Sequence, residues 1–130
     1  MASKKDKAIH QGFEGRDKRG QFTKITGDMM KSQAWQALTL RQRGLYLTLK
    51  SKYREKKLDN VVVESNKDNI SMPESEWRCL YGNYNTFKKD MDALKQHGFI
   101  KMVARAKYMG KPNIYGFDDA WTVDGTKKDA

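Results

Sequence analysis

The chain has 130 residues and a formal net charge of +10, because 26 lysines and arginines outnumber 16 aspartates and glutamates. That length accommodates one ordinary domain with a single small core. No apolar run reaches the roughly 18 residues that cross a bilayer, and the first residues lack the apolar stretch of a secretory signal, so we expect a cytoplasmic protein without a membrane partner. A lone cysteine excludes an internal disulfide, and the two histidines, His10 and His97, are too distant for a zinc cluster. We expect no metal, no other cofactor and no small-molecule ligand.

The positive charge is unevenly distributed along the chain. Residues 29–57 carry eight basic and one acidic side chain, and residues 83–116 carry seven and two. The intervening residues 58–82 carry two basic and five acidic side chains. Two basic blocks on either side of an acidic one indicate a polyanionic partner, and nucleic acid is the first candidate.

The N-terminal part predicts an arm followed by a short helix. Residues 1–24 mix basic, glycine and polar residues with few apolar ones, which predicts a flexible basic arm. The stretch "DMMKSQAWQAL" then predicts one helix, capped by Thr26 or Asp28 and anchored by Trp35. The expected buried face of this helix consists of Met30, Ala34, Ala37 and Leu38.

A second helix, the longest expected, covers about residues 40–56 after Thr39. Its apolar face is formed by Gln42, Leu45, Tyr46, Leu49 and Tyr53. Basic residues flank this face, namely Arg43, Lys50 and Arg54 on one side and Arg41, Lys52 and Lys56 on the other. These side chains either cover the edge of the core with their stems or contact DNA, and the pattern leaves both readings open.

The middle of the chain is predicted to be strand, loop and a short helix. "NVVVES" has the β-branched composition of a strand, and "NKDNISM" reads as a loop followed by a brief strand at residues 70–72. "PESEWRCLY" predicts a helix with Pro73 in its first turn, capped by Ser71 or Ser75 and ending at Gly82. We expect Cys79 in this helix to be a buried thiol.

The next helix carries the strongest amphipathic pattern. Asn85 or Thr86 is expected to cap it, and Gly98 to end it. Its core face is Phe87, Met91 and Leu94, whereas the opposite face presents Asn85, Lys89 and Gln96, with Lys88 and Lys95 to one side. Asp92 is placed to pair with Lys88 and Lys89. Taken alone, this polar face is as typical of an ordinary solvent-exposed helix as of a helix that binds a partner.

The last elements form a predicted β-hairpin. "FIKMVARAK" can pair antiparallel with "NIYGF", with a turn at Lys111, Pro112 and Asn113. The preceding helix and the basic hairpin tip then project to the same side, a shape that can grip a duplex. Trp121 either packs on the first helices or serves a dimer contact, and we favour packing.

These stretches resemble the winged helix-turn-helix family, and more narrowly the small winged-helix proteins of plasmids, phages and conjugative elements and replication-initiator N-terminal domains. The likeness covers residues 22–117, and its most specific part is "TFKKDMDALKQHGFI", in which a helix ends in Gly before a strand, as in a recognition helix that leads into the wing. It implies an α+β winged helix-turn-helix with three to four helices and a β-hairpin wing, over residues 25–121, followed by a disordered tail at 122–130. The insertion "LDNVVVESNKDN" and the acidic "FDDAW" depart from the family pattern.

The resemblance implies that the helix of residues 85–96 docks in the major groove of double-stranded DNA, where Asn and Gln read adenine and Lys reads guanine. The polar turn before it binds phosphate, and the wing contacts the backbone or the minor groove. The DNA-binding residues so expected are Asn83, Tyr84, Asn85, Thr86, Lys88, Lys89, Asp92, Gln96, Arg105, Lys107, Tyr108 and Lys111.

Other classes of function fit the sequence less well. We predict no enzyme and no catalytic residue, because the chain lacks a Gly-rich phosphate loop, a Ser/His/Asp order and a metal cluster beside a tyrosine. A protein-interaction module that binds an acidic partner remains the alternative. Among DNA-binding roles, the likeness favours an accessory or regulatory factor of a mobile element that acts in plasmid replication, at a transfer origin or in transcription. A homodimer and a larger replication or transfer complex both stay open.

Overall fold

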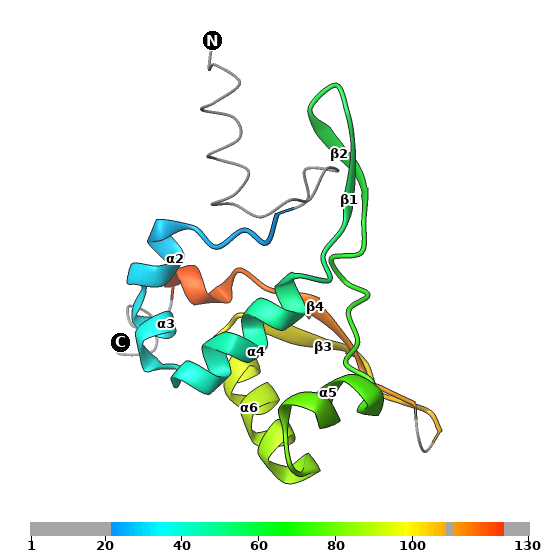
Figure 1. The fold of residues 1–130 in the computed structure, drawn as a ribbon. Helices are drawn as coiled ribbons and strands as arrows, with labels where there is room; N and C mark the ends of the chain where they lie inside the picture. The colour runs from blue at the N-terminus through cyan, green and yellow to red at the C-terminus, as the bar shows by residue number, and fades with distance from the viewer. Residues whose placement is uncertain (1–21, 109–110, 124–130) are drawn as a thin grey trace, which may run out of the picture.

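The computed structural model describes residues 22–108 and 111–123 and has an α+β architecture (Figure 1). The predicted arm up to residue 21 and the predicted tail from residue 124 lie outside these described residues. In chain order, the described elements are α2 (Gly27–Lys31), α3 (Gln33–Ala37), α4 (Leu40–Lys50), β1 (Glu55–Leu58), β2 (Val61–Ser65), α5 (Glu74–Leu80), α6 (Tyr84–Gln96), β3 (Ile100–Ala104), β4 (Ile114–Phe117) and the 3₁₀ helix η1 (Ala120–Val123). No helix in the described part of the chain is long and apolar enough to cross a membrane.

The first predicted helix is in fact two short helices, α2 and α3. Ser32 separates them in an extended conformation (φ −67°, ψ 151°), and its hydroxyl oxygen accepts a hydrogen bond from the Trp35 N–H. The single-helix prediction was wrong because a serine that caps the second helix ends the first. Thr26 caps α2 as expected, but the break rotates the faces, so Met29 is buried whereas Met30 is 51% exposed.

Helix α4 begins as predicted and ends earlier than predicted. Thr39 and Gln42 form a reciprocal capping box, which fixes its first turn. The helix ends at Lys50 rather than near residue 56, because residues 55–58 pair with residues 61–65 as strands β1 and β2. Asp59 and Asn60 make the tight turn between these strands, with φ of 52° and 66°. The expected strand at "NVVVES" is confirmed, whereas its partner strand β1 was missed.

The β1–β2 hairpin stands away from the rest of the described chain (Figure 1). Every residue of both strands is exposed, including the apolar Leu58, Val61, Val62 and Val63. The β1–β2 hairpin therefore adds little to the core, and the compact part of the described chain consists of α2–α6, β3 and β4.

The core is an aromatic and aliphatic cluster between α3, α4, α6 and the β3–β4 hairpin. Tyr46 of α4 lies with its ring centroid 5.3 Å from that of Phe99 and 6.0 Å from that of Phe117. The predicted core face of α6 is confirmed, and that of α4 is confirmed except for Tyr53, which lies beyond the end of the helix and is half-buried. The buried apolar members of the two faces are Leu45, Tyr46, Leu49, Phe87, Met91 and Leu94. Burial raises the pKa of the Tyr46 hydroxyl to about 12.

Helix α5 differs from the prediction in its cap and in its cysteine. Pro73 occupies the N-cap position and no side chain caps the helix, so neither Ser71 nor Ser75 acts as the cap. Cys79 is exposed rather than buried, because Trp77 and Tyr81 supply the core face of this segment. Glu74 and Arg78 pair along the exposed side of the helix.

A single residue outside the hairpin, Ile70, pairs with β4 as an isolated β-bridge. Ile70 and Tyr115 exchange two backbone hydrogen bonds, 2.9 and 2.7 Å long, so residue 70 lies on the outer edge of β4. Only Ile70 of the predicted strand at residues 70–72 pairs in this way. The turn also closes earlier than expected, since the Lys111 N–H donates to the Tyr108 carbonyl, while the side-chain oxygen of Asn113 accepts from the Ala106 N–H.

Trp121 packs back on the core as predicted. Its ring stacks on Phe99 at a centroid distance of 6.1 Å and an interplanar angle of 7°. Gly98, which ends α6 with φ +85°, permits this approach, since a Cβ there would lie 2.6 Å from the Trp121 backbone nitrogen. A glycine is therefore required at this position on both conformational and steric grounds.

We expect Gly98→Ala to lower the free energy of unfolding by about 2 kcal/mol or more, because it combines a strained backbone with a clash against backbone atoms. Urea denaturation followed by circular dichroism measures the change.

Gly44→Ala is the matched control for this prediction. Gly44 lies inside α4, and a Cβ added there would meet no atom of another element within 4 Å. Alanine at this position should raise stability by about 0.5–1 kcal/mol. Equal effects of the two substitutions would contradict the role assigned to Gly98.

Candidate nucleic-acid interface

Helix α6 begins two residues earlier than the sequence indicated. Asn83, rather than Asn85 or Thr86, is the N-cap, and its side-chain oxygen accepts hydrogen bonds from the Thr86 N–H (2.9 Å) and hydroxyl (3.1 Å). Tyr84, Asn85 and Thr86 therefore form the first helical turn rather than a preceding loop. Their side chains point in the directions that the helix dictates, about 100° apart per residue.

The predicted polar face of α6 is exposed and borders a shallow surface hollow. This hollow is lined by Gln42, Asn85, Lys88, Lys89, Asp92, Ala93 and Gln96. Five of the twelve residues predicted to bind DNA thus share one surface, with α4 contributing Gln42 at its edge. Side chains that can donate to base edges or phosphates gather here along one helix.

Asp92 pairs with two lysines of α6: the predicted pair with Lys88 is confirmed, whereas Lys95 takes the place predicted for Lys89. Its carboxylate contacts Lys88 Nζ at 3.1 Å and Lys95 Nζ at 3.1 Å, which leaves Lys89 without an acidic partner among the described residues. Burial acts to raise the pKa of Asp92, but the hydrogen bonds from the two lysines outweigh it, so this pKa is lowered. Lys89 is consequently the lysine of this face that is available to an external anion.

A buried carboxylate, missed at the sequence level, holds α6 in place. Asp90 is 0% exposed and accepts hydrogen bonds from Arg41 (2.6 and 3.1 Å), Gln42 Nε2 (3.2 Å) and Tyr81 Oη (2.6 Å). These donors come from α4 and from the end of α5. Burial acts to raise the pKa of Asp90, and the hydrogen bonds from Arg41, Tyr81 and Gln42 together lower it below its usual range.

The sequence does contain a signal for this network. Asp90 falls between Phe87 and Leu94 on the apolar face of the helix, where an acid requires a buried partner. Its closeness to Asp92 in the sequence suggests instead an acidic pair on a basic helix. The structure separates the two: Asp92 is a surface residue, whereas Asp90 belongs to the interior.

The basic side chains of α4 largely serve the fold. Arg43 donates from Nε to the Trp35 carbonyl at 3.1 Å, and Lys50 lies 4.8 Å above the centre of the Phe117 ring. Lys52, just beyond the end of α4, pairs with Glu76 of α5. These contacts match the reading in which the side chains cover the edge of the core.

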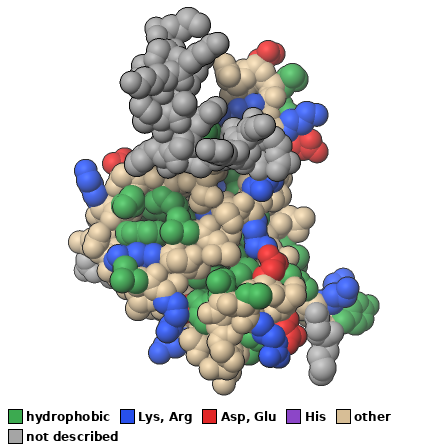
Figure 2. Space-filling model, in the orientation of Figure 1, with side chains coloured by type: hydrophobic (Ala, Val, Ile, Leu, Met, Phe, Trp, Pro, Cys, Tyr) green, Lys and Arg blue, Asp and Glu red, His purple; other side chains and the backbone are tan. Residues whose placement is uncertain are grey.

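The basic residues toward the tip of the β3–β4 hairpin differ from these, and also from Lys101 of β3, which pairs with Asp68 at 3.6 Å. Arg105, Lys107 and Lys111 are exposed, and none of them pairs with an acid in the described ranges. Tyr108 is 74% exposed. Figure 2 shows basic and hydrophobic side chains together at this projecting tip.

Eight of the twelve predicted site residues line one of two surface pockets. The α6 group borders the hollow described above, whereas Tyr84, Tyr108 and Lys111 line a second pocket between α6, α5 and the hairpin. Asn83, Thr86, Arg105 and Lys107 line neither. Since α6 packs against β3, the helix and the hairpin are adjacent parts of one body.

Comparison of the chain with protein-family models, with curated proteins and with solved structures gave no match.

We expect Asp90→Asn to lower the free energy of unfolding by about 2 kcal/mol at neutral pH, because a neutral amide replaces a carboxylate that accepts hydrogen bonds from a charged group. The loss should shrink below about pH 4. As the pH is lowered through this range, the Asp90 carboxylate takes up a proton in the unfolded chain before it does so in the folded chain. The free energy of unfolding of the wild type therefore decreases as the pH is lowered. Urea denaturation at a series of pH values measures both effects.

Asp92→Asn is the matched control, two residues away on the same helix. It removes surface ion pairs, whose contribution is about 0.2–1 kcal/mol. A loss as large as that of Asp90→Asn would contradict the distinction between a structural and a surface carboxylate.

Proposed function

We propose that this chain is a winged helix-turn-helix protein that binds double-stranded DNA in a sequence-specific manner. The observation that carries the proposal is the adjacency of α6, with its exposed Asn, Lys and Gln face, to a β-hairpin whose basic tip has no acidic partner among the described residues. The element order supports it as well: α4, the strand position at Ile70, α5, α6 and the hairpin follow one another as the resemblance implies.

In the proposed complex, α6 enters the major groove. Its 13 residues make a rod about 20 Å long, and a groove about 12 Å wide accepts a helix of this kind. Asn85 and Gln96 then read adenine edges, and Lys89 reaches the guanine acceptors O6 and N7. In the complex, Lys88 and Lys95 exchange their surface pairs with Asp92 for contacts with the flanking phosphates.

The hairpin supplies the second contact. Arg105, Lys107 and Lys111 project beside α6 and bind the sugar-phosphate backbone or the minor groove, which fixes the orientation of the helix. A duplex on this surface leaves the β1–β2 hairpin uncovered, because that hairpin extends from the opposite end of the body (Figure 1).

The biological role rests on the family likeness alone. We propose an accessory or regulatory factor of a mobile genetic element that acts in plasmid replication, at a transfer origin or in transcription. Each of these roles requires only that the right DNA site be bound.

We expect the purified chain to bind one of the DNA fragments around its own gene in preference to an unrelated duplex, as measured by fluorescence anisotropy. Lys89→Ala should weaken binding to that fragment by at least about 5-fold and relax its selectivity, because a base contact is lost. Arg105→Ala should weaken binding to all duplexes and reduce the log–log salt slope by about one unit, because a phosphate contact is lost.

Lys56→Ala is the matched control, since Lys56 is an exposed lysine of β1, remote from α6. It should leave affinity and salt slope unchanged. If Lys56→Ala weakens binding as much as Lys89→Ala, only a diffuse basic surface is acting. Absence of binding at low salt would reject the proposal in favour of an acidic protein partner.

A further inference from the structure

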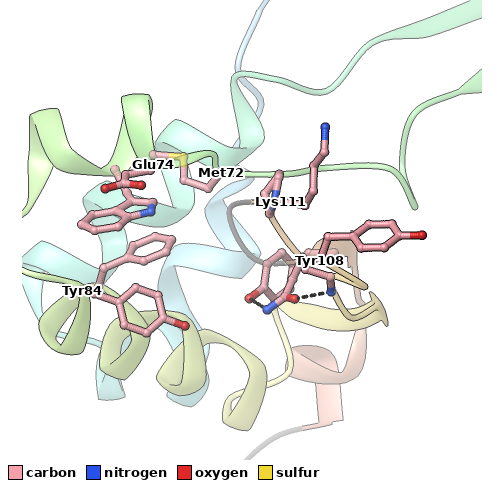
Figure 3. Close-up of a pocket in the computed structure, with 11 residues that line it drawn as sticks. Met72, Glu74, Tyr84, Tyr108 and Lys111 are labelled. Carbon is pink, nitrogen blue, oxygen red and sulfur yellow. Dashed lines mark hydrogen bonds between the residues drawn. The ribbon is translucent and has the colours of Figure 1, made fainter.

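A pocket of about 350 Å³ lies between the start of α6, helix α5 and the β3–β4 hairpin (Figure 3). We call it the aromatic pocket. Among its lining residues are Trp77, Tyr84 and Phe87 on the helical side and Tyr108, Lys111 and Asn113 on the hairpin side. Its volume lies at the lower end of the range of about 300–1,000 Å³ that small-molecule sites occupy.

One wall is a layered set of aromatic rings. Trp77 of α5 stacks on Phe87 of α6 with centroids 5.4 Å apart and planes 10° apart. Tyr84 lies against both, with centroids 5.7 Å from Trp77 and 6.3 Å from Phe87. Trp77 and Phe87 are buried, but Tyr84 is 49% exposed, so its ring forms the accessible part of this wall.

The opposite wall comes from the hairpin and is held by hydrogen bonds. The Asn113 amide accepts from the Ala106 N–H at 2.7 Å and donates to the Tyr115 hydroxyl at 3.4 Å, which the dashed lines in Figure 3 mark. Lys111 and Tyr108 lie on this side, across the pocket from Tyr84. The two walls thus belong to the two elements that the proposed function places on DNA.

The charges at the rim select a particular kind of ligand. Lys111 brings a cation to the hairpin side, and no acid among the described residues pairs with it. Glu74 lies at the α5 side, where Arg78 already pairs with it. Aromatic faces with a cation at one side suit a planar ring that carries a phosphate, which is the chemistry of a nucleotide.

We propose that the aromatic pocket takes one unpaired base of the bound DNA, which stacks on Tyr84 while its phosphate lies near Lys111. This inference rests on the proposed function. A base within the DNA is favoured over a free nucleotide, because Tyr84 directly precedes Asn85 of the α6 DNA face and Lys111 shares a hairpin with Arg105 and Lys107. The flanking contacts hold the base beside the pocket, which raises its effective concentration there.

The test compares two DNA duplexes that differ in a single base. One is fully paired, and the other carries one extra unpaired base at successive positions of the selected site. By fluorescence anisotropy, the wild-type chain should prefer the second duplex by at least about 5-fold at one of these positions, as expected for base stacking on an aromatic side chain. Equal affinity for both duplexes at every position would overturn the inference and leave the proposed function intact.

Variants at Tyr84 locate the base. Tyr84→Leu keeps an apolar contact with Trp77 and Phe87 but removes the aromatic face, so the ratio of the two affinities should fall to about one. Tyr84→Phe should keep the ratio. Leu80→Ala is the matched control, because Leu80 is an exposed residue of α5 outside the pocket, and it should also keep the ratio. A preference that survives in Tyr84→Leu would place the base elsewhere and overturn the assignment.

Two further outcomes are distinct. Tight binding of thymidine monophosphate alone, measured by isothermal titration calorimetry, would assign the pocket to a free nucleotide and overturn the DNA-base assignment. Failure to bind either duplex at low salt would overturn both this inference and the proposed function.

Discussion

The buried carboxylate of Asp90 is the interaction on which the placement of α6 depends. A charge fully removed from water is tolerated only when it is paired and hydrogen-bonded, and Asp90 meets this requirement through Arg41, Gln42 and Tyr81. Its donors arise from α4 and from the end of α5, so a rotation or shift of α6 would leave a buried charge without partners. The network therefore fixes which face of α6 is turned outward. The Asn, Lys and Gln residues of that face take no part in the network, but it determines their orientation.

The same logic explains why net charge alone is a poor guide to a binding surface. Several cations of α4 and the residues after it are used internally: Arg41 by Asp90, Lys52 by Glu76, and Lys50 over the Phe117 ring. The cations of the β3–β4 hairpin tip have no such partners in the part of the chain that the structure describes. A composition count gives both groups equal weight. Only the three-dimensional pairing separates cations that stabilise the fold from those that remain available to an external anion.

Sequence periodicity predicted the amphipathic faces of α4 and α6 and the β3–β4 pairing, because each of these depends on apolar spacing. It failed where a single local hydrogen bond decides the structure: Ser32 divides α2 from α3, and Asn83 starts α6 two residues early. It also failed at β1, where the charged residues 55–57 precede a single leucine, so that no apolar alternation marks a strand. These residues become a strand only because the Asp59–Asn60 turn folds them onto β2. The Asp90 network joins residues nearly 50 positions apart, which periodicity within one element does not reach.

The first turn of α6 links the two parts of the proposed interface. Asn83 fixes where the helix begins, and from that point the residues diverge by about 100° each, so Tyr84 faces the aromatic pocket while Asn85 borders the outer hollow. One capping side chain thus sets the register of both surfaces. A duplex read by the outer face of α6 and a base held against Tyr84 are therefore not independent binding events. The same helical turn presents both, and the Asp90 network, farther along α6, holds the helix against α4 and the end of α5.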